Sequence, residues 1–280
     1  KCNTAIGYAS LNNNIASNNT ALGKSSLQAN TTGADNVAVG VGALDANTTA
    51  DDNTAVGKDA LTTNTVGFDN TAVGKDALKT NLGGDHHTAL GSGALEKNSD
   101  GDNNTAVGWD SQNDNTTGSD NNSLGRESLH SNTTGVNNVA IGSCAMYTNT
   151  TGGENTAVGF GSQGSNTTAG ENSSFGNQSL CTNSTGCRNT SIGYRSMCSN
   201  TTGNNNTALG KDSLKCNTTG EENVALGSGA MLDNTTGSRN VAVGRRALQE
   251  NTTSEGNTAL GNSAMQNNTT GAGNTAVGNL

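Results

Sequence analysis

The chain lacks proline altogether and is poor in aromatic residues, with one tryptophan, three tyrosines and three phenylalanines in 280 residues. Only 30% of it is hydrophobic, which is too little for a conventional core at this length. No run approaches the roughly 18 consecutive apolar residues of a membrane span. Acidic residues outnumber basic ones by 23 to 14, which argues against nucleic acid as a partner. This composition is typical of disordered chains, but here the polar residues recur in register.

The recurring element is a repeat of the type N-T-A-V-G, which begins at Asn3, Asn19, Asn36 and so on to Asn274. The first interval is 16 residues and the other fifteen are 17. The consensus is N-T-A-V-G-x-x-A-L-x-x-N-T-T-G-x-x, and its places are numbered 1 to 17 below. No linker interrupts the array, so we expect residues 1–280 to form a single repeat array, cut from a longer chain.

A repeat of 17 residues is too short for a pair of helices but suits one coil of a β-solenoid, in which each coil hydrogen-bonds to the next. Position 2 is mostly Thr but is Val at Val37, Val139, Val224 and Val241, which is typical of a β-branched strand site. The sequence therefore predicts an all-β fold, a parallel β-solenoid of sixteen 17-residue coils. We expect one strand at positions 2 to 4 and a second around positions 8 to 10.

The direction in which the strand faces is left open by the pattern. Positions 2 and 4 share one face of the strand and position 3, which is only Ala or Ser, has the other. If the large residues of positions 2, 4 and 9 point inward, the Ala/Ser columns of positions 3 and 8 form an outer strip suited to a close sheet-to-sheet contact. If Ala and Ser instead face inward in a narrow coil, the Val and Leu columns lie outside. Both orientations predict a partner.

Position 12 is Asn in all fifteen 17-residue repeats. Stacked coils would place these side chains in a ladder, each amide bonding to the neighbouring coil, as in other stacked β-structures. The predicted structural ladder includes Asn30, Asn47, Asn64, Asn132, Asn149, Asn200, Asn217, Asn234 and Asn268.

Repeats such as Asn53-Thr54-Ala55-Val56-Gly57, followed by Ala60 and Leu61, resemble the N-S-V-A-I-G coils of trimeric autotransporter adhesin heads. The whole array is more similar still to the N-T-A-V-G…A-L…N-T-T-G repeats of tail-fibre-like and surface-fibre proteins. The resemblance implies a parallel β-roll, with three chains often side by side, on a bacterial or viral surface. The adhesin heads have shorter coils and do not account for the N-T-T-G corner.

The chain offers little for catalysis, and we expect no enzyme activity, no cofactor and no metal site. It has neither an H-E-x-x-H nor a G-x-S-x-G nor a P-loop motif. His87 occupies the Asn place of a repeat start and His86 precedes it. A solvated corner is the expected environment for this pair.

Four of the six cysteines lie within 36 residues: Cys181, Cys187, Cys198 and Cys216. Cys181 and Cys198 both occupy position 10 of neighbouring coils, which places their Cα atoms within disulfide range. Cys187 and Cys216 are further candidates in the same region. A local disulfide would indicate an oxidising compartment, and free thiols are the alternative.

The N-T-T triplets at positions 12 to 14 are formal N-glycosylation acceptors, but stacked glycans would collide, so an internal amide ladder is the expected use of these asparagines. Sparse glycosylation elsewhere, for example at Asn121 or Asn172, stays open for a eukaryotic source. The same Thr residues suggest a second function, in which Thr ranks on a flat face bind ice. The pairs are adjacent, as in Thr31-Thr32, and adjacent strand residues face opposite ways, so only one rank could be presented.

Position 6 is variable and collects four of the seven aromatic residues: Tyr8, Trp109, Phe160 and Tyr194. They form a candidate recognition surface, for example for stacking on sugars, and ordinary surface variation is the alternative. The sequence thus predicts an extracellular fibre or adhesin segment on a cell or virion surface. Its expected partners are further copies of itself and a host surface or glycan, and a monomeric ice-binding solenoid is the alternative.

Overall fold

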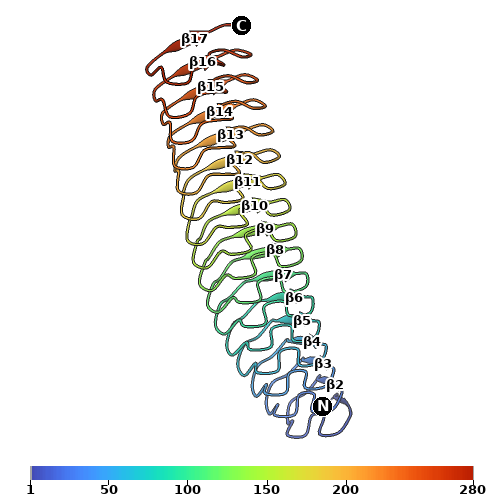
Figure 1. Ribbon diagram of the computed structural model, residues 1–280. Coiled ribbons are helices and arrows are strands. Elements are labelled where there is room, and N and C mark those ends of the chain that lie inside the picture. Colours follow the sequence, from blue (N-terminus) through green and yellow to red (C-terminus); the bar gives the residue numbers. More distant parts are fainter. Residues whose placement is uncertain (1, 280) are drawn as a thin grey trace. The chain divides into compact units, whose positions relative to one another are not determined.

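A computed structural model describes residues 2–279 and confirms the parallel β-solenoid. Each coil contributes one strand of three residues, and no helix occurs among the described residues (Figure 1). The strands are β1 Thr4–Ile6, β2 Thr20–Leu22, β3 Val37–Val39, β4 Thr54–Val56, β5 Thr71–Val73, β6 Thr88–Leu90, β7 Thr105–Val107, β8 Asn122–Leu124, β9 Val139–Ile141, β10 Thr156–Val158, β11 Ser173–Phe175, β12 Thr190–Ile192, β13 Thr207–Leu209, β14 Val224–Leu226, β15 Val241–Val243, β16 Thr258–Leu260 and β17 Thr275–Val277.

The chain forms two compact units, unit 1 up to Asn138 with β1–β8 and unit 2 from Val139 with β9–β17. Within each unit, consecutive strands pair in parallel and in exact register. In unit 1, for example, Ala38 of β3 pairs with Ala55 of β4. In unit 2, Ala225 of β14 pairs with Ala242 of β15. The 17-residue period therefore aligns each position of a coil with the same position of the next one.

The second strand expected at positions 8 to 10 is absent, and that prediction was wrong. Positions 7 and 9 have a left-handed backbone, as at Asp59 (φ 56°) and Leu61 (φ 51°), which excludes the extended conformation of a strand. The segment forms turns, and its N–H groups still donate to neighbouring coils. Leu44 N–H, for instance, donates to Ala60 O at 3.0 Å. Hydrogen bonding between coils thus continues without a second strand.

The invariant glycine of position 5 follows the strand and turns the chain. Gly57 has φ 143°, and a Cβ atom added there would lie 2.4 Å from the carbonyl oxygen of Gly74 in the next coil. Any side chain would therefore separate the coils. This close approach of two backbones explains why position 5 accepts only glycine.

The interior settles the orientation that the sequence left open. Ala55 at position 3, Ala60 at position 8 and Leu61 at position 9 are fully buried, whereas Thr54 and Val56 at positions 2 and 4 are only partly buried. Ala and Ser thus face inward, because the coil is narrow and leaves little room between the strand and the opposite turn. The interpretation of the Ala/Ser columns as an outer contact strip was wrong, and the Val and Leu column of position 4 lies outside.

Candidate interaction surface

Two ladders of hydrogen-bonded side chains, mostly asparagines, run inside the coils and join each coil to the next. At position 12, Asn47 Nδ2 donates to Asn30 Oδ1 at 2.8 Å and to Ala50 O at 3.0 Å. In unit 1 the ladder continues through Asn64 to Asn132. In unit 2 it runs from Asn149 through Asn200, Asn217 and Asn234 to Asn268. All of these are fully buried except Asn268.

The second ladder, at position 1, was missed by the sequence analysis. Asn36 N–H donates to Asn19 Oδ1 at 2.9 Å, and Asn36 Nδ2 donates to Ala50 O at 2.9 Å. The same arrangement buries Asn121 and Asn172, whose amides donate to Gly135 O and Gly186 O. These two asparagines, at which the sequence left glycosylation open, are therefore not accessible as glycosylation sites. The near-invariance of Asn at repeat starts was the available signal.

His87 takes the place of Asn in the position 1 ladder and is 1% exposed, so the expected solvated corner was wrong for it. Its Nδ1 accepts the N–H of Asn104 at 3.2 Å, and its Nε2 lies 3.0 Å from Asn98 Nδ2. Burial lowers the pKa of His87 from 6.5 to about 4. His86 is exposed, by contrast, and packs edge-on against Phe68.

Cys181 and Cys198 form a disulfide between adjacent coils of unit 2, with Cα atoms 4.9 Å apart. The other two candidates are free and half-buried. Burial raises the pKa of the Cys216 thiol. Cys187 lies at the corner of positions 16 and 17, where its Sγ accepts the N–H of Gly170 at 3.4 Å. Within residues 2–279, no group of three or more His, Cys, Asp or Glu residues could hold a metal ion.

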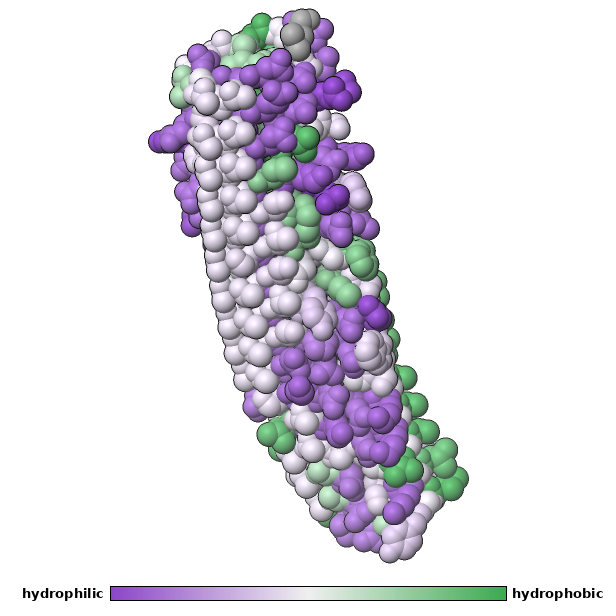
Figure 2. All heavy atoms as spheres, in the orientation of Figure 1, coloured by the Kyte–Doolittle hydropathy of each residue, from purple (hydrophilic) through white to green (hydrophobic). Residues whose placement is uncertain are grey.

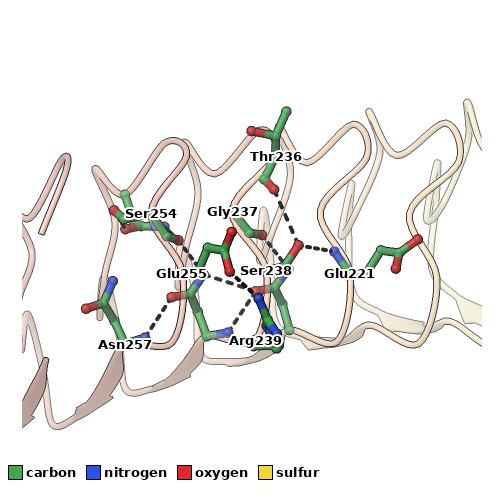
Figure 3. Close-up of polar contacts among 11 residues, drawn as sticks. Glu221, Thr236, Gly237, Ser238, Arg239, Ser254, Glu255 and Asn257 are labelled. Atoms are coloured by element: carbon green, nitrogen blue, oxygen red, sulfur yellow. Dashed lines mark hydrogen bonds and ion pairs between the residues drawn. The ribbon is translucent and has the colours of Figure 1, made fainter. Parts of the chain in front are cut away.

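The same corner carries polar contacts between coils, which Figure 3 shows for part of unit 2. Glu221 N–H donates to Ser238 Oγ at 3.0 Å, and the Ser238 hydroxyl donates to Thr236 O. Arg239 forms an exposed ion pair with Glu255. Short polar side chains of position 16 thus cap the N–H groups of the preceding coil, which satisfies backbone groups that no strand pairs.

The structure does not gather the four predicted recognition residues into one site. Tyr8 and Trp109 lie in the first and seventh coils, within unit 1, and Phe160 and Tyr194 lie two coils apart in unit 2. All four are exposed. The two Thr residues within a pair also differ in environment. Thr31 Oγ1 donates to Thr48 O at 2.9 Å, so the first Thr of each pair helps to join the coils, while Thr32 beside it is exposed.

The outer face of the strands forms a regular surface on each unit. Its position 4 column is apolar in all seventeen strands, and none of the strand residues is charged. Eleven of these side chains are between 37% and 73% exposed: Ile6, Leu22, Val73, Leu90, Leu124, Ile141, Phe175, Ile192, Leu209, Leu260 and Val277. Figure 2 shows green apolar residues reaching the surface beside purple hydrophilic ones. We call positions 2 and 4 of the strands the outer strand face.

The outer strand face has two columns of different chemistry. Position 2 is partly exposed in most strands and is Thr in eleven of the seventeen. Position 4 is Val, Leu, Ile or Phe. Exposed apolar columns of this length are unusual on a surface that only meets water. The absence of charge across the face is a property of interface cores.

Comparison with models of known protein families and with curated proteins finds no match to the chain. Among residues 2–279, no helix has the length and apolar character of a membrane span.

Proposed function

We propose that the chain is a structural segment of an extracellular fibre, in which copies pack side by side through the outer strand face. The observation that carries this proposal is the position 4 column, which stays large and apolar in every strand although eleven of its side chains are exposed and the other six are only partly buried. A position 4 exposed only to solvent would tolerate Lys or Glu, as the variable positions 6 and 7 do. Burial against a second copy accounts for the restriction.

The area of the face agrees with a stable contact. Eight strands spaced by about 4.8 Å, each three residues of about 3.3 Å long, give roughly 400 Å² per unit. Contacts through this face in each of the two units would sum to about the 800 Å² per partner of a standard protein interface. The intercoil disulfide between Cys181 and Cys198 supports a location outside the cell, where such bonds persist.

Size-exclusion chromatography with light scattering tests this proposal. We expect the native protein to have the mass of two or three chains, or of a longer filament. A double substitution, Ile141→Glu with Leu209→Glu, should give monomers because it buries carboxylates in the contact. Asn177→Glu with Asn262→Glu is the matched control, since it adds the same two charges at exposed position 6. A native protein that stays monomeric at every concentration contradicts the proposal.

A second candidate, ice binding, is favoured by one observation. The Thr column of position 2 lies in register beside the apolar column of position 4 on one outward face, so two ordered ranks are presented there. This face differs from the adjacent Thr pairs that the sequence first suggested. An ice-growth assay distinguishes the two functions: a monomer that shapes growing ice supports this candidate, and an oligomer that leaves ice growth unchanged supports the fibre.

A further inference from the structure

A pocket with excess positive charge lies on unit 2, where the coils of β13 to β15 meet at positions 6, 7 and 10. It has a volume of about 180 Å³ and is lined by residues that include Lys211, Asp212, Gly229, Arg245, Arg246 and Gln249. We call it the basic notch. It lies away from the outer strand face, which consists of positions 2 and 4, so it is a separate feature of the same coils.

Gly229 creates the notch. Its φ is 65°, and a Cβ atom added there would meet only Arg246 Cγ, at 3.8 Å. Other coils place an aspartate at this position with the same left-handed backbone, for example Asp76 (φ 57°) and Asp212 (φ 53°). The coil of β14 therefore lacks both the volume and the negative charge that an aspartate would supply at this point.

The positive charges of the notch are not all balanced by ion pairs among the residues that the structure describes. In other coils a basic residue at position 6 pairs with the acid that follows it, as Lys58 does with Asp59 at 2.7 Å. Arg245 is followed by Arg246 instead, and neither forms an ion pair with any residue in the range 2–279 that the structure describes. Asp212 is the only acid of the lining, and it already pairs with Lys211 and Lys215.

One coil before Asp212, and outside the lining of the notch, Arg195 is a third guanidinium that forms no ion pair with any residue of the range 2–279. Its Nε atom is buried and has no hydrogen-bond partner among residues 2–279. The surroundings also favour an anion here more than in unit 1. Unit 1 carries a formal charge of -8 and unit 2 only -1, which together give the -9 of the chain.

We propose that the basic notch binds a sulfate or carboxylate group of an acidic polysaccharide. Guanidinium groups recognise such planar or tetrahedral anions through paired N–H donors. Tyr194 is exposed at position 6, one coil before Lys211, and its ring gives an apolar surface beside the anion site for a sugar. The position 6 column is neutral on both sides of these coils, at Asn177 and Asn262. A nucleic acid, which needs a longer row of phosphate contacts, fits this short cluster less well.

Isothermal titration of the full chain tests the site with four probes: heparin oligosaccharide, polygalacturonate oligosaccharide, inorganic sulfate and single-stranded DNA of equal charge. We expect at least one of the two glycans to bind more tightly than sulfate or DNA. The affinity for that glycan should fall as added salt screens the charges. Arg245→Gln with Arg246→Gln should lower that affinity roughly tenfold or more, because charge-assisted hydrogen bonds are lost. Gly229→Asp should do the same by filling the notch.

Arg239→Gln is the control, because Arg239 is an exposed arginine of the same unit that pairs with Glu255 at another corner (Figure 3). The affinity of the Arg239→Gln variant for the glycan should equal that of the native protein. The proposal is overturned if neither glycan binds, if Gly229→Asp and the double variant bind as the native protein does, or if sulfate or DNA binds as tightly as the glycan. Light scattering of each variant keeps this result separate from self-association, on which the notch does not depend.

Discussion

Gln112 Nε2 donates a hydrogen bond to Ser123 Oγ at 2.7 Å, from one coil to the next. Gln163 and Ser174 repeat this contact at 2.9 Å in unit 2. These are the two coils in which position 9 is not Leu or Met, and in both cases the next coil has Ser in place of Ala at position 3. The two substitutions thus belong together, because a buried amide requires a partner.

The pair should nevertheless cost stability, because the Oε1 atom of Gln112 is buried without a hydrogen-bond partner among the described residues. Gln112→Leu combined with Ser123→Ala restores the consensus and should raise the free energy of unfolding by about 1–3 kcal/mol. Gln112→Leu alone should gain less, since Ser123 loses one partner. Denaturant titration of the three proteins measures the difference. A double variant less stable than the native protein would contradict this account.

Removing one member of the position 12 ladder should be costly. Asn64 donates to Asn47 Oδ1 and Gly67 O, and its Oδ1 accepts from Asn81. Asn64→Ala leaves these buried groups without partners and should cost about 3 kcal/mol or more. Thr49→Ala, at an exposed position 14, is the control and should change stability by less than about 0.5 kcal/mol. Equal effects of the two substitutions in thermal denaturation would show that the ladder adds no stability.

Acid should weaken unit 1 through His87. The pKa of His87 is about 4 in the folded protein and near 6.5 in the unfolded chain. Between these two pH values the unfolded chain therefore binds more protons than the folded protein. The stability contributed by neutral His87 is therefore complete above pH 6.5 and is lost as pH falls toward 4, by roughly 3 kcal/mol in all. His87→Asn should remove this part of the pH dependence. The denaturation midpoints of both proteins at pH 4 and 7 test this prediction. Identical pH profiles of the two proteins would refute a contribution from His87.

Reducing the disulfide should loosen the middle of unit 2. Cys181 and Cys198 close a loop with a sequence separation of 17, and loop closure of this size is worth about 3 kcal/mol in the chain-entropy model. Cys198→Ser should therefore speed hydrogen exchange of amides in the coils of β11 and β12 and make it insensitive to reductant. Cys216→Ser is the control and should keep the reductant effect.

The repeat was sufficient to predict the solenoid, because a strict period forces equivalent residues to stack. The orientation of the strand was not predictable, since Ala55 and Val56 alternate in the same way whichever of them faces inward. The turn at positions 7 to 9 was also hidden, because a left-handed backbone at a residue such as Leu61 leaves no mark in the sequence pattern. The buried state of His87 could have been inferred from its place at an Asn position. The basic notch could not be predicted from the sequence, because it forms only where three coils stack and bring Gly229 next to Arg246.

The register of the coils also bears on how such a gene can change. Since each position of a coil contacts the same position of its neighbours, as Ala38 and Ala55 do, inserting or deleting 17 residues within a unit leaves a complete set of contacts at the new junction. Unequal recombination could therefore lengthen or shorten the array without an intermediate that fails to fold. The junctions between Gln112 and Ser123, between Gln163 and Ser174, and between Cys181 and Cys198 are exceptions, because a coil inserted there would separate the paired residues.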